Sequence, residues 1–252
     1  MSKLIYAVLL INGNNEDKLF ETVSCLKGCA GSILYTVQLN NLAAVVCNIA
    51  AEDLVKDVPS ILGYAHVIES LMKVFTLLPM RFGSIFDSTD QIFAMLLKNA
   101  SKFQIKLKSL EDKYEFGLKI KFDSDKLKED LTDKVGIQIN DSEPISVKEE
   151  STIFRQYVEQ KLVKHRLEEQ YVAFKETVLS RLSEYLKPLN ESFFFDKHGG
   201  SSNIIDTYML MSLIKKEEIV DLVNSLQLEF PSISFTLTGP WPPYNFADIT
   251  IK

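Results

Sequence analysis

The stretch that decides the fold lies at residues 33–49 and reads ILYTVQLNNLAAVVCNI. Two runs rich in apolar and β-branched residues, at 33–39 and 42–49, flank the pair Asn40-Asn41. Each run has the length of an ordinary strand, and asparagine tolerates the positive φ that a tight turn requires. The stretch therefore predicts a β-hairpin.

The residues before the hairpin predict a strand and a helix. Residues 4–11, LIYAVLLI, form a continuous apolar run of strand length, which is typical of a central strand buried on both faces. Asn14 or Asn15 can cap a helix that runs to about Lys27, with apolar residues at helical spacing.

The residues after the hairpin predict a helix at 60–75, a short strand at 77–82 and, capped by Ser88, a helix at 89–110. The order of elements up to this point is β-α-β-β-α-β with one added helix.

The second half of the chain repeats this order around a long helix. Residues 115–123 alternate between apolar and charged side chains, which predicts a half-buried strand. Residues 123–143 are polar and turn-rich, and we expect an excursion or mobile loop there. A helical pattern spans about 147–187; at 1.5 Å per residue an unbroken helix would measure about 60 Å, so it must project, bend or divide, most readily at its polar part, 160–169. The remaining predicted elements are strands at 192–196, 205–214 and 232–238 and a helix at 215–228.

These patterns predict an α+β fold with two domains. Residues 1–111 are expected to form an N-terminal α+β domain and residues 112–252 a C-terminal one. The C-terminal domain is expected to be a modified ferredoxin-like β-α-β-β-α-β domain with a long helix and an aromatic, proline-rich tail. No similarity of individual residues relates the two halves.

The composition indicates a globular chain in a reducing compartment. Hydrophobic residues make up 46% of the 252 residues, and the net charge is −6 with a pI near 5.3, which disfavours nucleic acid as a partner. The three cysteines, Cys25, Cys29 and Cys47, are an odd number without metal-ligand spacing, so we interpret them as buried thiols. No apolar stretch reaches the length of about 18 residues that a membrane span requires. The chain is therefore expected to be cytoplasmic, with no lipid membrane as a partner.

No catalytic, cofactor-binding or metal-binding residues are predicted. The motifs of phosphate loops, dinucleotide folds, serine hydrolases and zinc proteases are absent from the sequence. Cys47, His66 and an aspartate could form a nucleophilic set, but Cys47 alternates with apolar neighbours, which favours an inert thiol. Residues 198–203, HGGSSN, lack a lysine and do not stand at the start of a predicted helix. We therefore interpret them as a mobile hairpin loop and not as a phosphate site. We therefore expect that this protein is not an enzyme.

Two short stretches carry unusual chemistry. The first, residues 78–83, contains a proline in an apolar run, an arginine between apolar neighbours and a glycine, which indicates an edge strand or bulge. Its arginine would need a partner if it were buried, and the simplest interpretation is that it joins two elements. The second, residues 239–246, holds the only tryptophan and three of the eight prolines. The residues singled out in these stretches are Pro79, Arg81, Phe82, Gly83, Gly239, Pro240, Trp241, Pro242, Pro243, Tyr244 and Phe246.

The proline-rich tail has two possible uses. Proline restricts the backbone, so the segment is stiff and loses little entropy when it docks, while its aromatic residues offer large apolar area. It can latch onto its own protein or present aromatic side chains to a partner, and we favour the latch.

Three stretches together resemble the gas vesicle accessory proteins of the F and L type. They are IYAVL at 5–9, LLPMRFGSIF at 77–86 and, most specifically, GPWPPYNF at 239–246, in the same order along nearly the whole chain. Asn245 departs from the pattern, which has a small residue such as serine at that position.

The resemblance implies a non-enzymatic, minor structural or assembly component of gas vesicles, the hollow protein shells that give buoyancy. It implies the major shell protein and other gas vesicle accessory proteins as partners, and a wall-associated location in the cytoplasm. A small-molecule-binding regulatory protein built from ferredoxin-like domains is the alternative.

Overall fold

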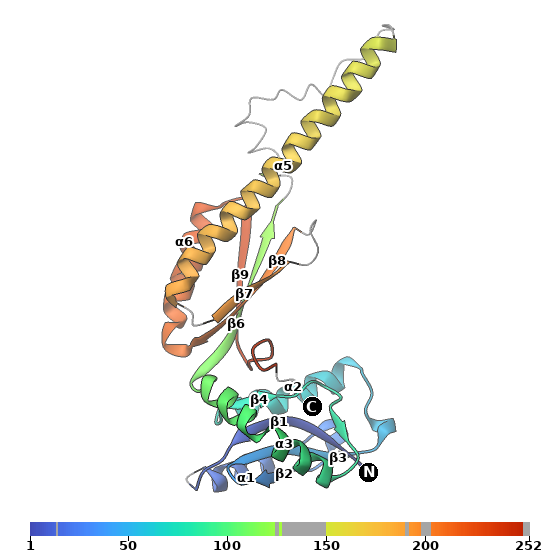
Figure 1. Cartoon of the computed structure of the whole chain (residues 1–252), viewed down its shortest axis with the longest axis vertical. Helices are drawn as coiled ribbons and strands as arrows, with labels where there is room; N and C mark the ends of the chain where they lie inside the picture. The colour runs from blue at the N-terminus through green and yellow to red at the C-terminus, as the bar shows by residue number, and fades with distance from the viewer. Residues whose placement is uncertain (14, 124–125, 128–149, 190–191, 198–202, 249–252) are drawn as a thin grey trace. The chain divides into compact units, whose positions relative to one another are not determined.

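The structure is a computed structural model of the whole chain and describes residues 1–13, 15–123, 126–127, 150–189, 192–197 and 203–248 (Figure 1). The chain forms two compact units. The first comprises 1–116, 210–214 and 238–252, and the second comprises 117–209 and 215–237.

The first unit is built on a five-stranded antiparallel sheet. Its strands are β1 (Ser2–Leu10), β2 (Leu34–Leu39), β3 (Leu42–Ile49), β4 (Leu77–Pro79) and β5 (Ile85–Phe86). The order is β2-β3-β1-β4, and β5 also pairs with β1. The predicted hairpin is confirmed: Leu39 pairs with Leu42 across the turn, and Asn40 has a φ of 51°. Strand β1 is central and buried, as its apolar sequence predicts.

Helices cover both faces of this sheet. They are α1 (Glu16–Cys25), α2 (Val58–Met72) and α3 (Thr89–Ser109), with short 3-10 turns at Cys29–Gly31 and Ala51–Asp53. Leu19 of α1 and Ile68 of α2 share one hydrophobic cluster with Val45 of the sheet. The intervening sheet residues, such as Val46, are also buried although they lie outside that cluster, because α3 packs against the other face.

The predicted cap of α3 is confirmed and that of α1 differs. Ser88 accepts a hydrogen bond from the backbone of Gln91 at the start of α3. Asn15 occupies the N-cap position of α1, but its side chain accepts from the backbone of Asn12 and makes no cap bond to the helix.

The second unit contains most of a four-stranded sheet and two helices. Its elements are β6 (Lys113–Phe122), α5 (Glu150–Leu189), β7 (Ser192–Lys197), β8 (Ile204–Ser212), a 3-10 turn at Leu213–Lys215, α6 (Lys216–Glu229) and β9 (Ile233–Trp241). The strand order is β7-β8-β6-β9. When the strands of each sheet are numbered by their order in the chain, the spatial order across both sheets is therefore second, third, first, fourth, with β5 as an addition to the first sheet.

The long helix is a single element. Helix α5 has 40 residues and neither bends into two helices nor divides at its polar part. Val178, Leu182 and Leu186 are fully buried, whereas Tyr157, Leu162 and Val172 are exposed. The helix thus projects beyond its own sheet, which was one of the three outcomes that its length permitted (Figure 1).

The α+β class is confirmed, but the division of the chain differs from the expected 1–111 and 112–252. The chain crosses into the second unit near residue 117 and returns to the first at 210–214 and at 238–252. The tail therefore belongs with the first unit. Hydrophobic patterns mark which residues are buried but not which element covers them, so the return was not visible in the sequence. The expected loops at 123–143 and 198–203 lie mostly outside the described residues.

Candidate functional site

The centre of the candidate site is Tyr64 of helix α2. Its ring stacks on Tyr6 with 4.6 Å between ring centroids and meets the edge of Phe82 at 5.2 Å. Its hydroxyl lies 2.8 Å from the carbonyl oxygen of Ile5 and 2.9 Å from that of Met80, to which it donates. Burial raises the pKa of this hydroxyl above its ordinary value. Tyr64 thereby connects α2, β1 and the start of the loop after β4.

Of the four residues singled out in the middle of the chain, Arg81, Phe82 and Gly83 lie in that loop and Pro79 directly precedes it. Pro79 ends β4, which is an edge strand, as a proline in an apolar run predicts. The backbone N–H of Ser84 and its hydroxyl both donate to the carbonyl oxygen of Arg81, and Gly83 between them has a φ of +87°. The turn is thus closed on itself, and the positive φ explains why glycine stands there.

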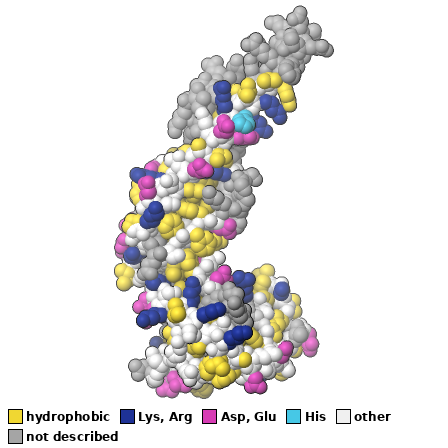
Figure 2. All heavy atoms as spheres, in the orientation of Figure 1, with side chains coloured by type: hydrophobic (Ala, Val, Ile, Leu, Met, Phe, Trp, Pro, Cys, Tyr) yellow, Lys and Arg dark blue, Asp and Glu magenta, His cyan; other side chains and the backbone are white. Residues whose placement is uncertain are grey.

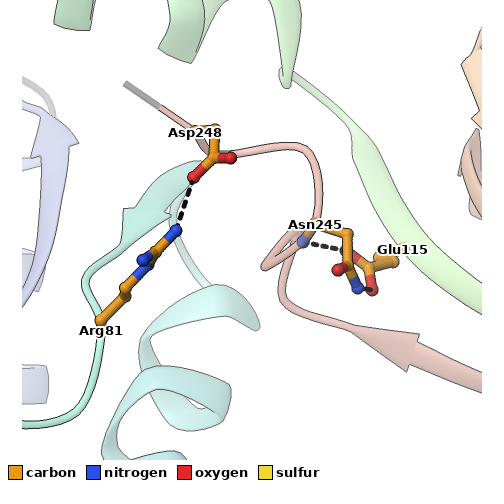
Figure 3. A network of polar contacts seen from close by, with 4 residues as sticks. All are labelled: Arg81, Glu115, Asn245 and Asp248. Carbon is orange, nitrogen blue, oxygen red and sulfur yellow. Dashed lines mark hydrogen bonds and ion pairs between the residues drawn. The ribbon is translucent and has the colours of Figure 1, made fainter. Parts of the chain in front are cut away.

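Arg81 is exposed and pairs with the tail. Its guanidinium lies 3.2 Å from the carboxylate of Asp248, and both side chains are more than four-fifths exposed, at 88% and 86% (Figure 3). The arginine therefore joins two elements as expected, but as a solvated pair, to which we assign no stabilisation. The pair brings together two stretches that are 167 residues apart in the sequence.

The tail packs onto the first unit through its prolines and its last aromatic residue. Pro242, Pro243 and Phe246 are buried. The backbone of Tyr244 donates to the carbonyl oxygen of Pro242, and that of Phe246 donates to Pro243, so the segment turns back on itself. The peptide bond between Gly239 and Pro240 is cis.

At Gly239 the backbone lies close to strand β6. Its φ is +111°, and a Cβ atom there would lie 2.9 Å from the carbonyl oxygen of Glu115 and 3.1 Å from the ring of Phe116. Only glycine combines this dihedral angle with this contact.

Asn245 and Glu115 clamp the tail in place (Figure 3). The backbone N–H of Asn245 donates to Glu115 Oε2 at 2.7 Å, and its side-chain amide donates to Oε1 at 2.6 Å. Glu115 is only 4% exposed, and this burial raises the pKa of its carboxyl although the hydrogen bonds from Asn245 oppose the rise. The clamp thus gives each oxygen of a buried carboxylate a hydrogen-bond donor.

Sequence reasoning missed both partners of this clamp. Glu115 looked like one of the charged side chains of the alternating run at 115–123, and Asn245 looked like a departure from the family pattern. Serine at this position would keep the backbone N–H and carry a hydroxyl, whereas asparagine carries an amide on a longer side chain, which donates to Glu115 Oε1.

Burial of the Glu115 carboxyl makes stability depend on pH. Because the folded state raises the pKa of Glu115, the folded protein binds the proton more tightly than the unfolded chain does. This contribution to stability is present below the ordinary pKa of glutamate and is lost as the pH rises through the raised value. We therefore expect that Glu115→Gln, which cannot titrate, changes the free energy of unfolding by different amounts at pH 4 and pH 7.

Urea denaturation at both pH values measures this difference. The wild type should gain stability relative to Glu115→Gln on acidification, and Glu111→Gln, which removes an exposed carboxylate from the same segment, is the matched control. Identical pH dependence of wild type and Glu115→Gln would contradict the raised pKa.

Two of the tail's aromatic side chains remain at the surface. Trp241 is 43% exposed and Tyr244 is 41% exposed. Partial burial raises the pKa of the Tyr244 hydroxyl to about 12, with smaller contributions from the carboxylates of Glu69 and Glu115. The prolines and Phe246 thus pack the tail onto the first unit, while Trp241 and Tyr244 stay partly exposed.

A cleft of about 210 Å³ lies beside the tail. It is lined by the turn at 72–77, by the junction at 110–114 and by Pro243. Ligand sites for small molecules usually occupy about 300–1,000 Å³, so this cleft offers little support for a regulatory ligand.

The two named members of the possible nucleophilic set, Cys47 and His66, differ in exposure. Cys47 is fully buried in the core with its sulfur 3.6 Å from the Tyr6 hydroxyl, whereas His66 is exposed on α2. Within the described ranges, no three His, Cys, Asp or Glu side chains are grouped to bind a metal ion. In the same ranges, no helix combines the length and the apolarity that crossing a bilayer would require.

Comparison with known proteins identifies the class to which this fold and tail belong. The model of the gas vesicle synthesis protein GvpL/GvpF family matches residues 3–248, and the chain is a member of this family.

Individual relatives agree with this membership. The chain is 24% identical over 237 residues to gas vesicle protein F1 of Halobacterium salinarum, covering 90% of this chain and 87% of that protein. The crystal structure of GvpF from Anabaena sp. PCC7120 aligns with a TM-score of 0.74 and 18% identity over 99% of this chain and 97% of that one. GvpF from Microcystis aeruginosa aligns with a TM-score of 0.72 and 13% identity over 98% and 99%. At these identities the two structures support the fold alone.

Proposed function

We propose that this protein is a non-enzymatic component of gas vesicle assembly that binds the major gas vesicle shell protein and other accessory proteins at the vesicle wall. The observation that carries the proposal is the docked tail: its prolines, Phe246 and the Asn245–Glu115 clamp hold the segment rigidly, while Trp241 and Tyr244 stay exposed. Exposed aromatic residues on a fixed backbone are typical anchors of protein interfaces, because little entropy is lost when they bind.

Covering the apolar surface of a shell subunit is a task that such an aromatic anchor could perform. A wall subunit that excludes water must carry an apolar surface, and before assembly this surface aggregates unless another protein covers it. The tail offers aromatic area to such a surface. Hydrophobic side chains also reach the surface between charges of both signs on the face drawn in Figure 2, and helix α2 leaves Val58, Ile61 and Leu62 exposed.

Replacing both exposed aromatic residues tests the proposal. We expect the double variant Trp241→Ala, Tyr244→Ala to weaken capture of the co-produced major shell protein by about tenfold or more, the effect of losing at least about 1.4 kcal/mol at an interface. Its free energy of unfolding should fall by well under the about 3–5 kcal/mol that truncating a buried tryptophan costs, since both side chains are partly solvated. Affinity capture with the tagged full chain, quantified by mass spectrometry, measures the first effect, and urea denaturation measures the second.

The matched control is Phe93→Ala, which removes an aromatic side chain of the same exposure, 43%, from helix α3. It should leave capture unchanged. Capture of no shell protein by the wild type, or equal capture by the double variant and the wild type, would overturn the role assigned to the tail. Fractionation of isolated vesicles tests the wall location, since a wall component remains with the washed shells.

A further inference from the structure

Strand β2 has an open outer edge. It pairs with β3 on one side, and at its beginning an isolated bridge joins Lys27 to Ile33. Beyond that bridge, the described part of the chain places no backbone partner on the outer side of β2. The register of the hairpin determines which backbone N–H and C=O groups of β2 point toward this outer side.

The hairpin register leaves the backbone of Thr36 and Gln38 pointing outward. In a two-residue hairpin the pair beside the turn, here Leu39 and Leu42, exchanges both backbone hydrogen bonds, and bonded pairs then alternate along the ladder. Val37 is therefore bonded to Ala44, while the N–H and C=O groups of Thr36 and Gln38 face away from β3.

This edge lacks the features that normally prevent edge pairing. Proteins protect edges with proline, with charged side chains or with very short strands. The opposite edge strand, β4, has three residues and ends at Pro79. Strand β2 has six residues, LYTVQL, with neither a charge nor a proline.

Exposed apolar side chains accompany the charged ones on the two helices that pack against β2. Helices α1 and α3 both pack against β2 and both carry exposed apolar side chains, as does the residue before the strand. These exposed residues are Phe20 at 74%, Ile33 at 74%, Leu97 at 60% and Ile105 at 73%. An added strand would place alternate side chains toward the two helix layers, so an apolar, uncharged strand fits best.

We propose that the outer edge of β2 receives an extended, uncharged strand of the gas vesicle shell protein, which adds to the sheet through the backbone of Thr36 and Gln38. This inference rests on the proposed function and assigns it a second contact besides the tail. Backbone hydrogen bonds supply the affinity in such strand addition, and the exposed apolar side chains beside the edge select those of the added strand.

A second copy of this chain is a poorer occupant of the edge. Pairing β2 with β2 of another copy around a two-fold axis would place α1 beside α1 and α3 beside α3. The exposed face of α1 is acidic, with Glu16, Asp17 and Glu21, and that of α3 is basic, with Lys98 and Lys102. Like charges would meet on both faces of the joined sheet, which disfavours self-pairing.

Proline substitutions on the open edge test the inference. Thr36→Pro and Gln38→Pro each remove an outward N–H without removing a donor from the hairpin ladder. Both should lower capture of the co-produced shell protein by the full chain by about tenfold or more. The controls Thr36→Ser and Gln38→Ser truncate the same side chains, keep the N–H and should capture as the wild type does. Melting temperatures establish that each variant is folded.

Amide exchange of the wild-type chain provides a test that needs no variant. The amides of Thr36 and Gln38 should exchange freely in the isolated protein and at least about tenfold more slowly in the complex, whereas Val37 and Leu39 are already bonded to β3 and should change little.

The outcomes separate this inference from the proposed function. If the wild type and the proline variants capture the shell protein equally, or if the Thr36 and Gln38 amides stay unprotected in the complex, the edge assignment is wrong and the proposed function stands. If the wild type captures none, both are wrong. If the wild type alone is a dimer by light scattering and Gln38→Pro restores the monomer, the edge serves self-pairing and the inference is overturned.

Discussion

Tyr64→Ala should lower the free energy of unfolding by about 3–5 kcal/mol, the cost of truncating a large buried aromatic side chain. Tyr64 is 3% exposed, stacks on Tyr6 and contacts Phe82. The truncation would leave a cavity between α2 and β1 and would remove the hydroxyl that the carbonyl oxygens of Ile5 and Met80 share. Denaturation followed by circular dichroism, with the transition of the first unit fitted separately, measures the loss.

Two further variants separate packing from hydrogen bonding at this position. Tyr64→Phe keeps the ring and should cost about 1–3 kcal/mol, because it leaves buried carbonyl oxygens without their donor. Tyr157→Ala removes the same atoms from a residue that is 56% exposed on α5 and should change stability by about 0.5 kcal/mol or less. Equal effects of Tyr64→Ala and Tyr157→Ala would contradict the central position of Tyr64.

Gly239→Ala should detach the tail. The substitution places a Cβ atom 2.9 Å from a backbone oxygen of β6 at a φ of +111°, and the unfavourable dihedral alone costs about 1–3 kcal/mol. Since backbone cannot move aside as a flexible side chain does, the segment should leave its position. The Asn245–Glu115 clamp and the burial of Phe246 would be lost with it.

The only tryptophan of the chain reports this detachment, because Trp241 lies two residues after the substitution. Acrylamide should quench its fluorescence more strongly in Gly239→Ala, and limited proteolysis should cleave the tail faster. The control is Gly63→Ala on α2, where a Cβ atom meets nothing within 4 Å. It should instead stabilise the helix by about 0.5–1 kcal/mol. An unchanged Trp241 signal in Gly239→Ala would show that the tail tolerates the added methyl group.

Local patterns predicted the elements of the fold well, because each depends on neighbouring residues. The pair Asn40-Asn41 predicted the hairpin, and the uninterrupted apolar run of β1 predicted its central place in the sheet. The periodicity of α5 predicted a long helix, but whether it would project, bend or divide depended on how far its own sheet reaches.

The candidate site could be predicted only in part. Its tail residues were singled out by composition, because eight residues hold three of the eight prolines and the only tryptophan. The partners of the tail were not, since Glu115 lies 130 residues before Asn245 and carries no local sign of burial. The ion pair between Arg81 and Asp248 likewise joins residues that no pattern relates.

Residue order alone was thus sufficient to establish the α+β class, the hairpin, the helices and the identity of the two unusual stretches. Those features depend on backbone preferences and on periodicity, which act over a few residues. Three-dimensional packing was needed to place the tail on the first unit, to bury Glu115, to leave Trp241 and Tyr244 exposed and to open the edge of β2. These features depend on which surfaces come into contact after folding, in the tail between residues more than a hundred positions apart. Short-range sequence patterns do not indicate such contacts.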